Sequence, residues 1–270
     1  MQWFEQEIEL AHNEGVSHPE NLPFFLAPDI SNGQAVILIH GFSASPREML
    51  PLGKFLLQHN FTVYGVRLPG HGTNPEDLAT RRAEEWVTTA ENGYQSLVEM
   101  GFKISVAGLS TGALITLKLA LQYRLEKLLL LSPFLRLEHF LAPFAGLLCY
   151  LIPYQKKVVS AAERPFYYQQ RPLKGIAQIN RLCRQLDGKL NSITTPSLVL
   201  TSTGDATIAP GTAAEIHRQL GSKQKQFHCY GNEVPHVLTT TENPRQQDVL
   251  QRCINFLDIK AYNREPSCTT

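Results

Sequence analysis

The sequence has no excess of charge of either sign and no hydrophobic run long enough to cross a bilayer. Its 270 residues include 25 Lys plus Arg and 24 Asp plus Glu, which gives a formal net charge of +1. A near-neutral chain without a basic stripe argues against nucleic acid and favours small neutral molecules as partners. The longest uncharged apolar stretch, residues 140–154, is too short for a membrane-spanning helix and contains two prolines. We expect no transmembrane segment, and at most a weak contact of this stretch with a membrane surface.

Cysteines are few and widely spaced. The five of them form no CxxC pair and have no metal-like spacing with histidine, so we expect reduced thiols and no metal site. Their surroundings predict that Cys149, Cys229 and Cys253 are small buried side chains and that Cys268 lies exposed in a polar tail. The first ten residues contain three glutamates and no Lys or Arg, unlike a secretory signal. These features predict a cytoplasmic location.

What the sequence does contain is an alternation of strand-like and helix-like segments. Six apolar segments predict strands: 35–40, 61–68, 104–109, 127–132, 197–203 and 225–231. Five periodic segments predict helices: 45–59, 83–100, 111–123, 211–220 and 244–260. The first of these helices opens with Ser45, Pro46 and Glu48, which together are typical of a capping box. Alternation of this kind predicts a doubly wound, parallel α/β sheet covered by helices on both faces.

Residues 133–192 interrupt this alternation, because they contain no convincing strand. They include the apolar stretch FLAPFAGLLCYLIPY, residues 140–154, followed by a polar, helix-like piece. Loops at the carboxyl ends of parallel strands surround the binding crevice of an open α/β sheet. We therefore predict a cap over that crevice, with an extra helical layer away from any site as the alternative. Phe144, Leu147 and Leu148 are the predicted residues of a substrate pocket.

The segment GLSTG, residues 108–112, places Ser110 between a predicted strand and a predicted helix. This context is the one that a nucleophile elbow requires, since the sharp turn exposes the serine hydroxyl at the edge of the sheet. Gly108 and Gly112 would avoid clashes with the adjoining strand and helix. Ser110 is therefore the predicted nucleophile, and an ordinary turn built from small residues is the alternative.

A serine needs a histidine as its base and a carboxylate that orients the histidine. In elbow enzymes the chain order is serine, acid, histidine. Asp205 directly follows the predicted strand 197–203, and His236 follows the strand 225–231, so both belong to the same edge as Ser110. The competing acids are Glu138 and Glu233.

The tetrahedral intermediate of acyl transfer needs two preorganised N–H donors. One is predicted to be the backbone N–H of Thr111, the residue after the nucleophile. The other is predicted to be the N–H of Phe42 in the segment HGFSAS, residues 40–45, where Gly41 allows a close approach.

These motifs resemble the α/β-hydrolase superfamily, and most closely its carboxylesterase and monoacylglycerol lipase group. The matching segments are HGF (40–42), LPGHG (68–72), GLSTG (108–112), the GD of TSTGDATI (201–208) and PHV (235–237). The resemblance implies an eight-stranded, mostly parallel sheet flanked by helices, with a small helical cap inserted after the sixth strand. It also implies a Ser110–Asp205–His236 triad, an oxyanion hole from Phe42 and Thr111, and no cofactor.

The expected organisation has four parts. Residues 1–32 are an N-terminal extension packed on the core, 33–132 and 193–262 are the α/β-hydrolase core, 133–192 are the cap insertion, and 263–270 are a flexible tail. The aromatic residues of the extension either pack on this core or help to form a dimer, so both a monomer and a homodimer remain open.

The predicted function is that of a serine hydrolase that cleaves short-to-medium acyl esters or monoacylglycerols, because the apolar cap sequence suits an acyl chain. Two alternatives remain. One is hydrolysis of a thioester, amide or C–C bond by the same triad, and the other is a non-catalytic protein that binds ligands with this fold.

Overall fold

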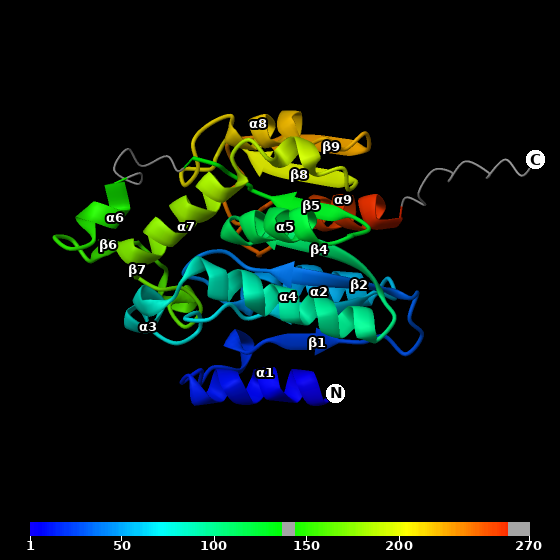
Figure 1. Ribbon diagram of the computed structural model, residues 1–270, viewed down its shortest axis with the longest axis horizontal. Coiled ribbons are helices and arrows are strands. Elements are labelled where there is room, and N and C mark those ends of the chain that lie inside the picture. The colour runs from blue at the N-terminus through cyan, green and yellow to red at the C-terminus, as the bar shows by residue number, and fades with distance from the viewer. Residues whose placement is uncertain (137–143, 259–270) are drawn as a thin grey trace, which may run out of the picture.

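A seven-stranded, mostly parallel sheet forms the centre of the molecule (Figure 1). The computed structural model describes residues 1–136 and 144–258. The strand order is β1-β3-β2-β4-β5-β8-β9, and only β1 runs antiparallel to its neighbour. The strands are β1 (Phe24–Leu26), β2 (Gln34–Ile39), β3 (Thr62–Val66), β4 (Lys103–Leu109), β5 (Leu128–Leu131), β8 (Ser197–Ser202) and β9 (Lys225–Tyr230).

The six predicted strands are all present, and those in the middle of the sheet are apolar on both faces. Every residue of β3, β5 and β8 is buried, as expected for parallel strands covered by helices on each side. The described residues contain seven strands of this sheet rather than the eight implied by the resemblance. The N-terminal segment contributes helix α1 and the edge strand β1, and the insertion follows β5, the fifth strand of the chain, rather than the sixth.

Helices cover both faces of the sheet. Helices α4 (Ala83–Glu99), α5 (Thr111–Gln122) and α8 (Thr212–Gln219) pack on one face, and α2 (Leu50–Leu57) and α9 (Gln246–Asp258) pack on the other. The predicted helix 45–59 is divided into a 3-10 turn, Pro46–Met49, and α2. This packing forms two apolar clusters, one on each face of the sheet. The clusters hold the ends of the strands in fixed positions.

The N-terminal extension lies along the β1 edge of the sheet. Helix α1 (Gln2–Asn13) packs the Trp3 ring edge-to-face on Tyr64 of β3, with 5.0 Å between the ring centroids. Its neighbour Phe4 contacts Phe25 of β1 at 5.7 Å. These aromatic contacts link the extension to the core cluster of one face.

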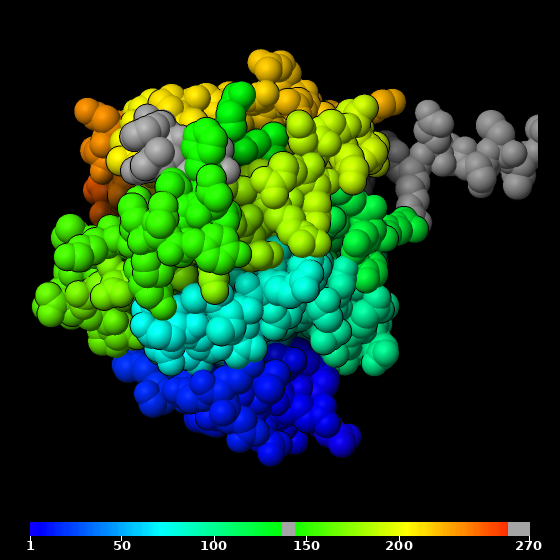
Figure 2. All heavy atoms as spheres, turned by 60° about the vertical axis from the view of Figure 1, so that its left-hand side comes forward, coloured from blue at the N-terminus to red at the C-terminus, as the bar shows by residue number. Residues whose placement is uncertain are grey.

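The segment between β5 and β8 lies at the carboxyl ends of the strands, on the left in Figure 1 and facing the viewer in Figure 2. It contains α6 (Ala145–Leu148), β6 (Tyr154–Lys156), β7 (Gln170–Pro172) and α7 (Leu173–Leu186). Strands β6 and β7 pair antiparallel in a sheet of their own. The prediction of no strand in this segment is therefore wrong, because the pair is too short to leave a periodic pattern. A short helix, α3 (Pro75–Thr80), was also not predicted and packs against β7 and α7.

The cysteine predictions are confirmed at two positions and wrong at one. Cys149 and Cys253 are buried, whereas Cys229 is exposed because β9 is an edge strand of the sheet. Cys268 lies outside the described residues. Within residues 1–136 and 144–258, no helix combines the length and the apolar character needed to cross a membrane.

Candidate active site

Ser110 lies in a strained turn between β4 and α5. Its backbone angles are φ 57° and ψ −117°, a region that L-residues rarely adopt. Both neighbouring glycines are required by close packing. A Cβ at Gly108 would lie 2.2 Å from the Gly112 carbonyl oxygen, and a Cβ at Gly112 would lie 2.1 Å from the Ile39 carbonyl oxygen. The turn therefore holds the Ser110 side chain in one position at the edge of the sheet.

The structure brings Ser110, His236 and Asp205 into one chain of hydrogen bonds. His236 Nε2 lies 2.8 Å from Ser110 Oγ, and His236 Nδ1 lies 2.5 Å from Asp205 Oδ2. The other carboxylate oxygen of Asp205 accepts the backbone N–H of Thr207 at 2.8 Å and of Ile208 at 3.3 Å. Because Asp205 is acceptor-only when ionised, Nδ1 carries the proton and Nε2 is free to accept the serine hydroxyl. Such an arrangement can remove a proton from Ser110.

Of the two competing acids, Glu233 does not take this place. Glu233 is exposed and its carboxylate folds over Gly231, where an added Cβ would lie 2.3 Å from Glu233 Oε2. Glu138 lies outside the described residues.

The two predicted oxyanion donors also line the pocket beside Ser110. In the described part of the chain, the backbone N–H groups of Phe42 and Thr111 donate no hydrogen bond, and both residues face the cavity. Gly41 packs closely, since a Cβ there would lie 3.4 Å from Ser110 Cβ. These free N–H groups can donate hydrogen bonds to a negatively charged oxygen.

His40 fixes the loop that carries Phe42. Its Nδ1–H donates to the Gly41 carbonyl at 2.8 Å, and its Nε2 accepts the backbone N–H of Leu68 at 3.2 Å. This pair of bonds requires a neutral imidazole. Burial accordingly lowers the pKa of His40 to about 4. Burial also lowers the pKa of His71, whose ring packs against His40 with 4.9 Å between centroids.

Glu48 belongs to the site, although its sequence context predicted a different role. The predicted capping box is wrong, because Ser45 makes no side-chain cap and Glu48 turns toward the site instead. Its Oε2 accepts the Gly41 N–H at 2.7 Å, and its Oε1 accepts the Tyr167 hydroxyl at 3.1 Å. Burial raises the pKa of this carboxyl, and the bond to Gly41 partly opposes the rise. Glu48 therefore connects the Phe42 loop to the insertion.

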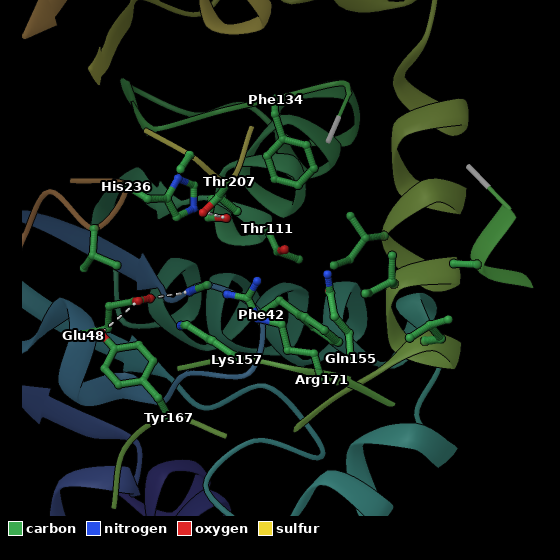
Figure 3. Close-up of a pocket in the computed structure, with 18 of the residues that line it drawn as sticks. Phe42, Glu48, Thr111, Phe134, Gln155, Lys157, Tyr167, Arg171, Thr207 and His236 are labelled. Carbon is green, nitrogen blue, oxygen red and sulfur yellow. Dashed lines mark hydrogen bonds between the residues drawn. The ribbon is translucent and has the colours of Figure 1, made fainter. Parts of the chain in front are cut away.

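A cavity of about 430 Å³ opens over Ser110 and His236 (Figure 3). Its apolar wall is made by Phe134 and by side chains of the insertion: Ala145, Leu148, Ile152, Leu173, Ile176 and Ile179. Of the three predicted substrate-pocket residues, Leu148 lines this cavity, whereas Phe144 and Leu147 do not belong to its lining. These two side chains are 57% and 73% exposed. The single turn of α6 directs Ala145 and Leu148 inward and leaves Phe144 and Leu147 on its outer side.

The opposite wall of the cavity is polar, which the apolar cap sequence did not predict. Gln155, Lys157, Tyr167 and Arg171 come from the β6–β7 region and lie along one side of the pocket together with Glu48 (Figure 3). Burial lowers the pKa of Lys157 to about 8, with the Arg171 charge acting in the same direction, and burial also lowers the pKa of Arg171. No local motif marks these residues, because their role depends on how the insertion folds back over the sheet.

The comparisons with known proteins agree with this architecture. A family model described as serine aminopeptidase, S33 (Hydrolase_4) matches residues 31–241. The chain therefore belongs to this family of α/β-hydrolases.

Two curated relatives and one solved structure are similar to most of the chain. The chain is 29% identical over 225 residues to a thermostable monoacylglycerol lipase of Bacillus sp. (strain H-257), with 82% of this chain and 89% of the relative covered. It is 25% identical over 211 residues to a carboxylesterase of Bacillus subtilis (strain 168), with 76% and 85% covered. The structure of a metagenome-derived lipolytic enzyme superposes with a TM-score of 0.77 at 23% identity, covering 88% of this chain and 98% of that one. The prediction of a hydrolase of the esterase and lipase type is confirmed.

Proposed function

We propose that the protein hydrolyses carboxylic esters through an acyl-enzyme formed on Ser110. The observation that carries the proposal is the hydrogen-bonded chain from Ser110 through His236 to Asp205 at the floor of an open pocket. The curated relatives, a lipase and a carboxylesterase, support the same reaction class.

The reaction proceeds in two halves. His236 Nε2 takes the hydroxyl proton as Ser110 Oγ attacks the ester carbonyl, and the imidazolium then gives this proton to the leaving alcohol oxygen. Asp205 orients the ring and stabilises its positive charge. The N–H groups of Phe42 and Thr111 receive the oxyanion. In the second half a water molecule gives a proton to His236 and attacks the acyl carbonyl; the acyl–Oγ bond then breaks, the imidazolium returns the proton to Ser110 Oγ, and the acid leaves.

The acyl part of the substrate is proposed to lie against the apolar wall. Phe134, Leu148 and the α7 side chains Ile176 and Ile179 offer a surface that excludes water, and burying each methylene of an acyl chain there contributes about 0.8 kcal/mol. This supports short-to-medium acyl esters, including monoacylglycerols, as the substrate class.

The test is hydrolysis of p-nitrophenyl esters from acetate to palmitate by the wild type and by Ser110→Ala. We expect turnover by the wild type, a preferred chain length, and a loss of about 10⁶-fold in kcat for the variant. Ser105→Ala is the matched control, because Ser105 is a buried serine of β4 whose hydroxyl has no hydrogen-bond partner within the described residues.

Retention of wild-type rates by Ser110→Ala would refute the assignment of the nucleophile. If a serine-directed phosphonate labels Ser110 but no oxygen ester is cleaved, the substrate bond is a thioester, amide or C–C bond instead.

We also propose that the insertion contacts a lipid surface when the substrate is not dissolved in water. Leu147, Leu151 and Val158 support this, since they are 73%, 81% and 99% exposed on the segment that forms the pocket wall. The triple change of these residues to Ser should reduce cosedimentation with phosphatidylcholine vesicles and leave hydrolysis of p-nitrophenyl acetate unchanged. Equal cosedimentation of the variant and the wild type would refute this contact.

A further inference from the structure

The two walls of the cavity differ in charge. The wall formed by Phe134 and α7 is apolar, whereas the β6–β7 wall brings Lys157 and Arg171 toward the middle of the pocket (Figure 3). An ester whose alcohol part is uncharged offers no group that two cations could bind. Burying the two cations in the pocket wall also costs desolvation free energy.

The protein neutralises the cations of this wall only in part, through the charge of Glu48, which acts on both Lys157 and Arg171. Glu48 is the only carboxylate that lines the cavity among the described residues. Its two oxygens already accept hydrogen bonds from the Gly41 N–H and the Tyr167 hydroxyl. Glu163, whose negative charge also favours the charged form of Lys157, forms an ion pair with Arg47 at 3.5 Å.

Neither cation has an ion-pair partner within residues 1–136 and 144–258. Lys157 Nζ lies 4.7 Å from the centroid of the Tyr167 ring, a cation–π contact. Arg171 Nε donates to Ser43 Oγ at 3.3 Å, and this is its one side-chain hydrogen bond in the described part of the chain. The lowered pKa values of both groups reflect this incomplete compensation. An anion between them would replace the lost hydration of both charges.

In the proposed function the acyl chain takes the apolar wall, which leaves the charged wall of the same cavity for the alcohol part of the ester. Lys157 and His236 line the same cavity, and both lie close enough to Glu48 to act on its carboxylate. His236 delivers its proton to the leaving oxygen. Arg171 reaches Ser43, the residue after Phe42, which places it beside the same reacting centre.

We propose that Lys157 and Arg171 bind an anionic group, a carboxylate or a phosphate, on the alcohol part of the ester. This inference rests on the proposed ester hydrolysis and narrows its substrate class to acyl esters of anionic alcohols. The acyl chain then lies along α7, and the charged alcohol lies along β6 and β7.

The experiment compares kcat/KM for four soluble esters. Three carry a butanoyl group on glycerol, on glyceric acid or on glycerol 3-phosphate, and the fourth carries a succinyl group on glycerol, which moves the charge to the acyl side. We expect the wild type to prefer at least one of the two esters of anionic alcohols over butanoylglycerol by about tenfold or more. The better of the two identifies the anion as carboxylate or phosphate.

Three variants test whether Lys157 and Arg171 cause that preference. Lys157→Gln and Arg171→Gln should each reduce the ratio of kcat/KM between the charged and the neutral ester by about tenfold, mainly through KM. Lys157→Arg should retain most of the ratio. Lys156→Gln is the matched control, because Lys156 is exposed and lies outside the cavity lining.

A measurement on the wild type alone covers the case in which a variant fails to fold. Glycerate or glycerol 3-phosphate should inhibit hydrolysis of p-nitrophenyl butanoate competitively at concentrations where glycerol does not.

Equal rates on all butanoyl esters without such inhibition, or a preference for the succinyl ester, would overturn this inference. The proposed function would survive that result, because Ser110-dependent ester cleavage would still be observed.

Discussion

Ser110 and Lys157 contribute to the same pocket from two differently built regions. Ser110 is held by backbone geometry, since its turn is flanked by glycines whose substitution would place a Cβ about 2 Å from a carbonyl oxygen. Lys157 directly follows β6 of a short two-stranded sheet and contacts the Tyr167 ring through its side chain. Backbone packing thus restricts the turn at Ser110, whereas we expect the insertion to tolerate substitutions with less effect on the fold. The difference suggests that the chemistry is fixed in the sheet and the substrate range is set in the insertion.

The strongest test of this division is Asp205→Asn at the sheet edge. We expect kcat to fall by about 10⁴-fold, because an asparagine favours the wrong tautomer of His236. The measurement is p-nitrophenyl ester hydrolysis, with Glu233→Gln as the control at the exposed acid near His236. If Glu233→Gln caused the larger loss, the acid would have to be reassigned.

The second test compares a glycine from each region. Gly112→Ala places a Cβ 2.1 Å from the Ile39 carbonyl oxygen, and we expect a loss of about 3 kcal/mol or more in the free energy of unfolding. Gly146→Ala in α6 meets only the Ala177 Cβ, at 3.8 Å, so its effect should stay within about 0.5 kcal/mol. Urea unfolding measures both. Equal losses would show that the insertion is as tightly constrained as the sheet.

Much of the site at the carboxyl ends of the strands is predictable from sequence, because each of its residues has a local sequence signal. Ser110 follows a strand and precedes a helix, and Asp205 and His236 each follow a strand of the same parallel sheet. Parallel strands bring such loops to one edge whatever the details of packing.

The polar wall has no comparable signal. Lys157 and Arg171 are separated by irregular chain, and only the pairing of β6 with β7 places them together. Glu48 was misread for a different reason: its spacing from Ser45 fits a capping box, but Gly41 and Tyr167 offer its carboxylate better partners. Tertiary contacts determine where these side chains lie, and the local sequence contains little information about such contacts.

A third prediction concerns pH and the histidines under the sheet edge. The pKa of His40 is lowered to about 4, so His40 stays neutral in the folded chain while the unfolded chain binds a proton near pH 6.5. Its contribution to stability is therefore complete above about pH 6.5 and is lost as the pH falls toward 4. His71, whose pKa is also lowered, acts in the same direction.

From His40 alone we expect a loss of about 3 kcal/mol in the free energy of unfolding over this range. Urea unfolding between pH 7 and 4 measures it, and His40→Gln should show a shallower dependence on pH. An unchanged slope in this variant would assign the acid sensitivity to other groups.

The smallest expected effect lies at the contact that joins the two regions, the hydrogen bond from Tyr167 to Glu48 Oε1. Tyr167→Phe removes a donor from a buried carboxylate whose other oxygen holds the Gly41 N–H, at a cost of about 1.5 kcal/mol. If Glu48 positions the Phe42 loop for the oxyanion, kcat should fall by about tenfold while KM for a short ester changes little. The acid limb of the kcat profile should move to higher pH, because the Tyr167 hydroxyl helps to keep Glu48 ionised. Tyr150→Phe, at an 80% exposed tyrosine of the insertion, is the control. A loss of stability in Tyr167→Phe without a change in kcat or in the pH profile would mean that the insertion packs on the sheet edge but does not act on the chemistry there.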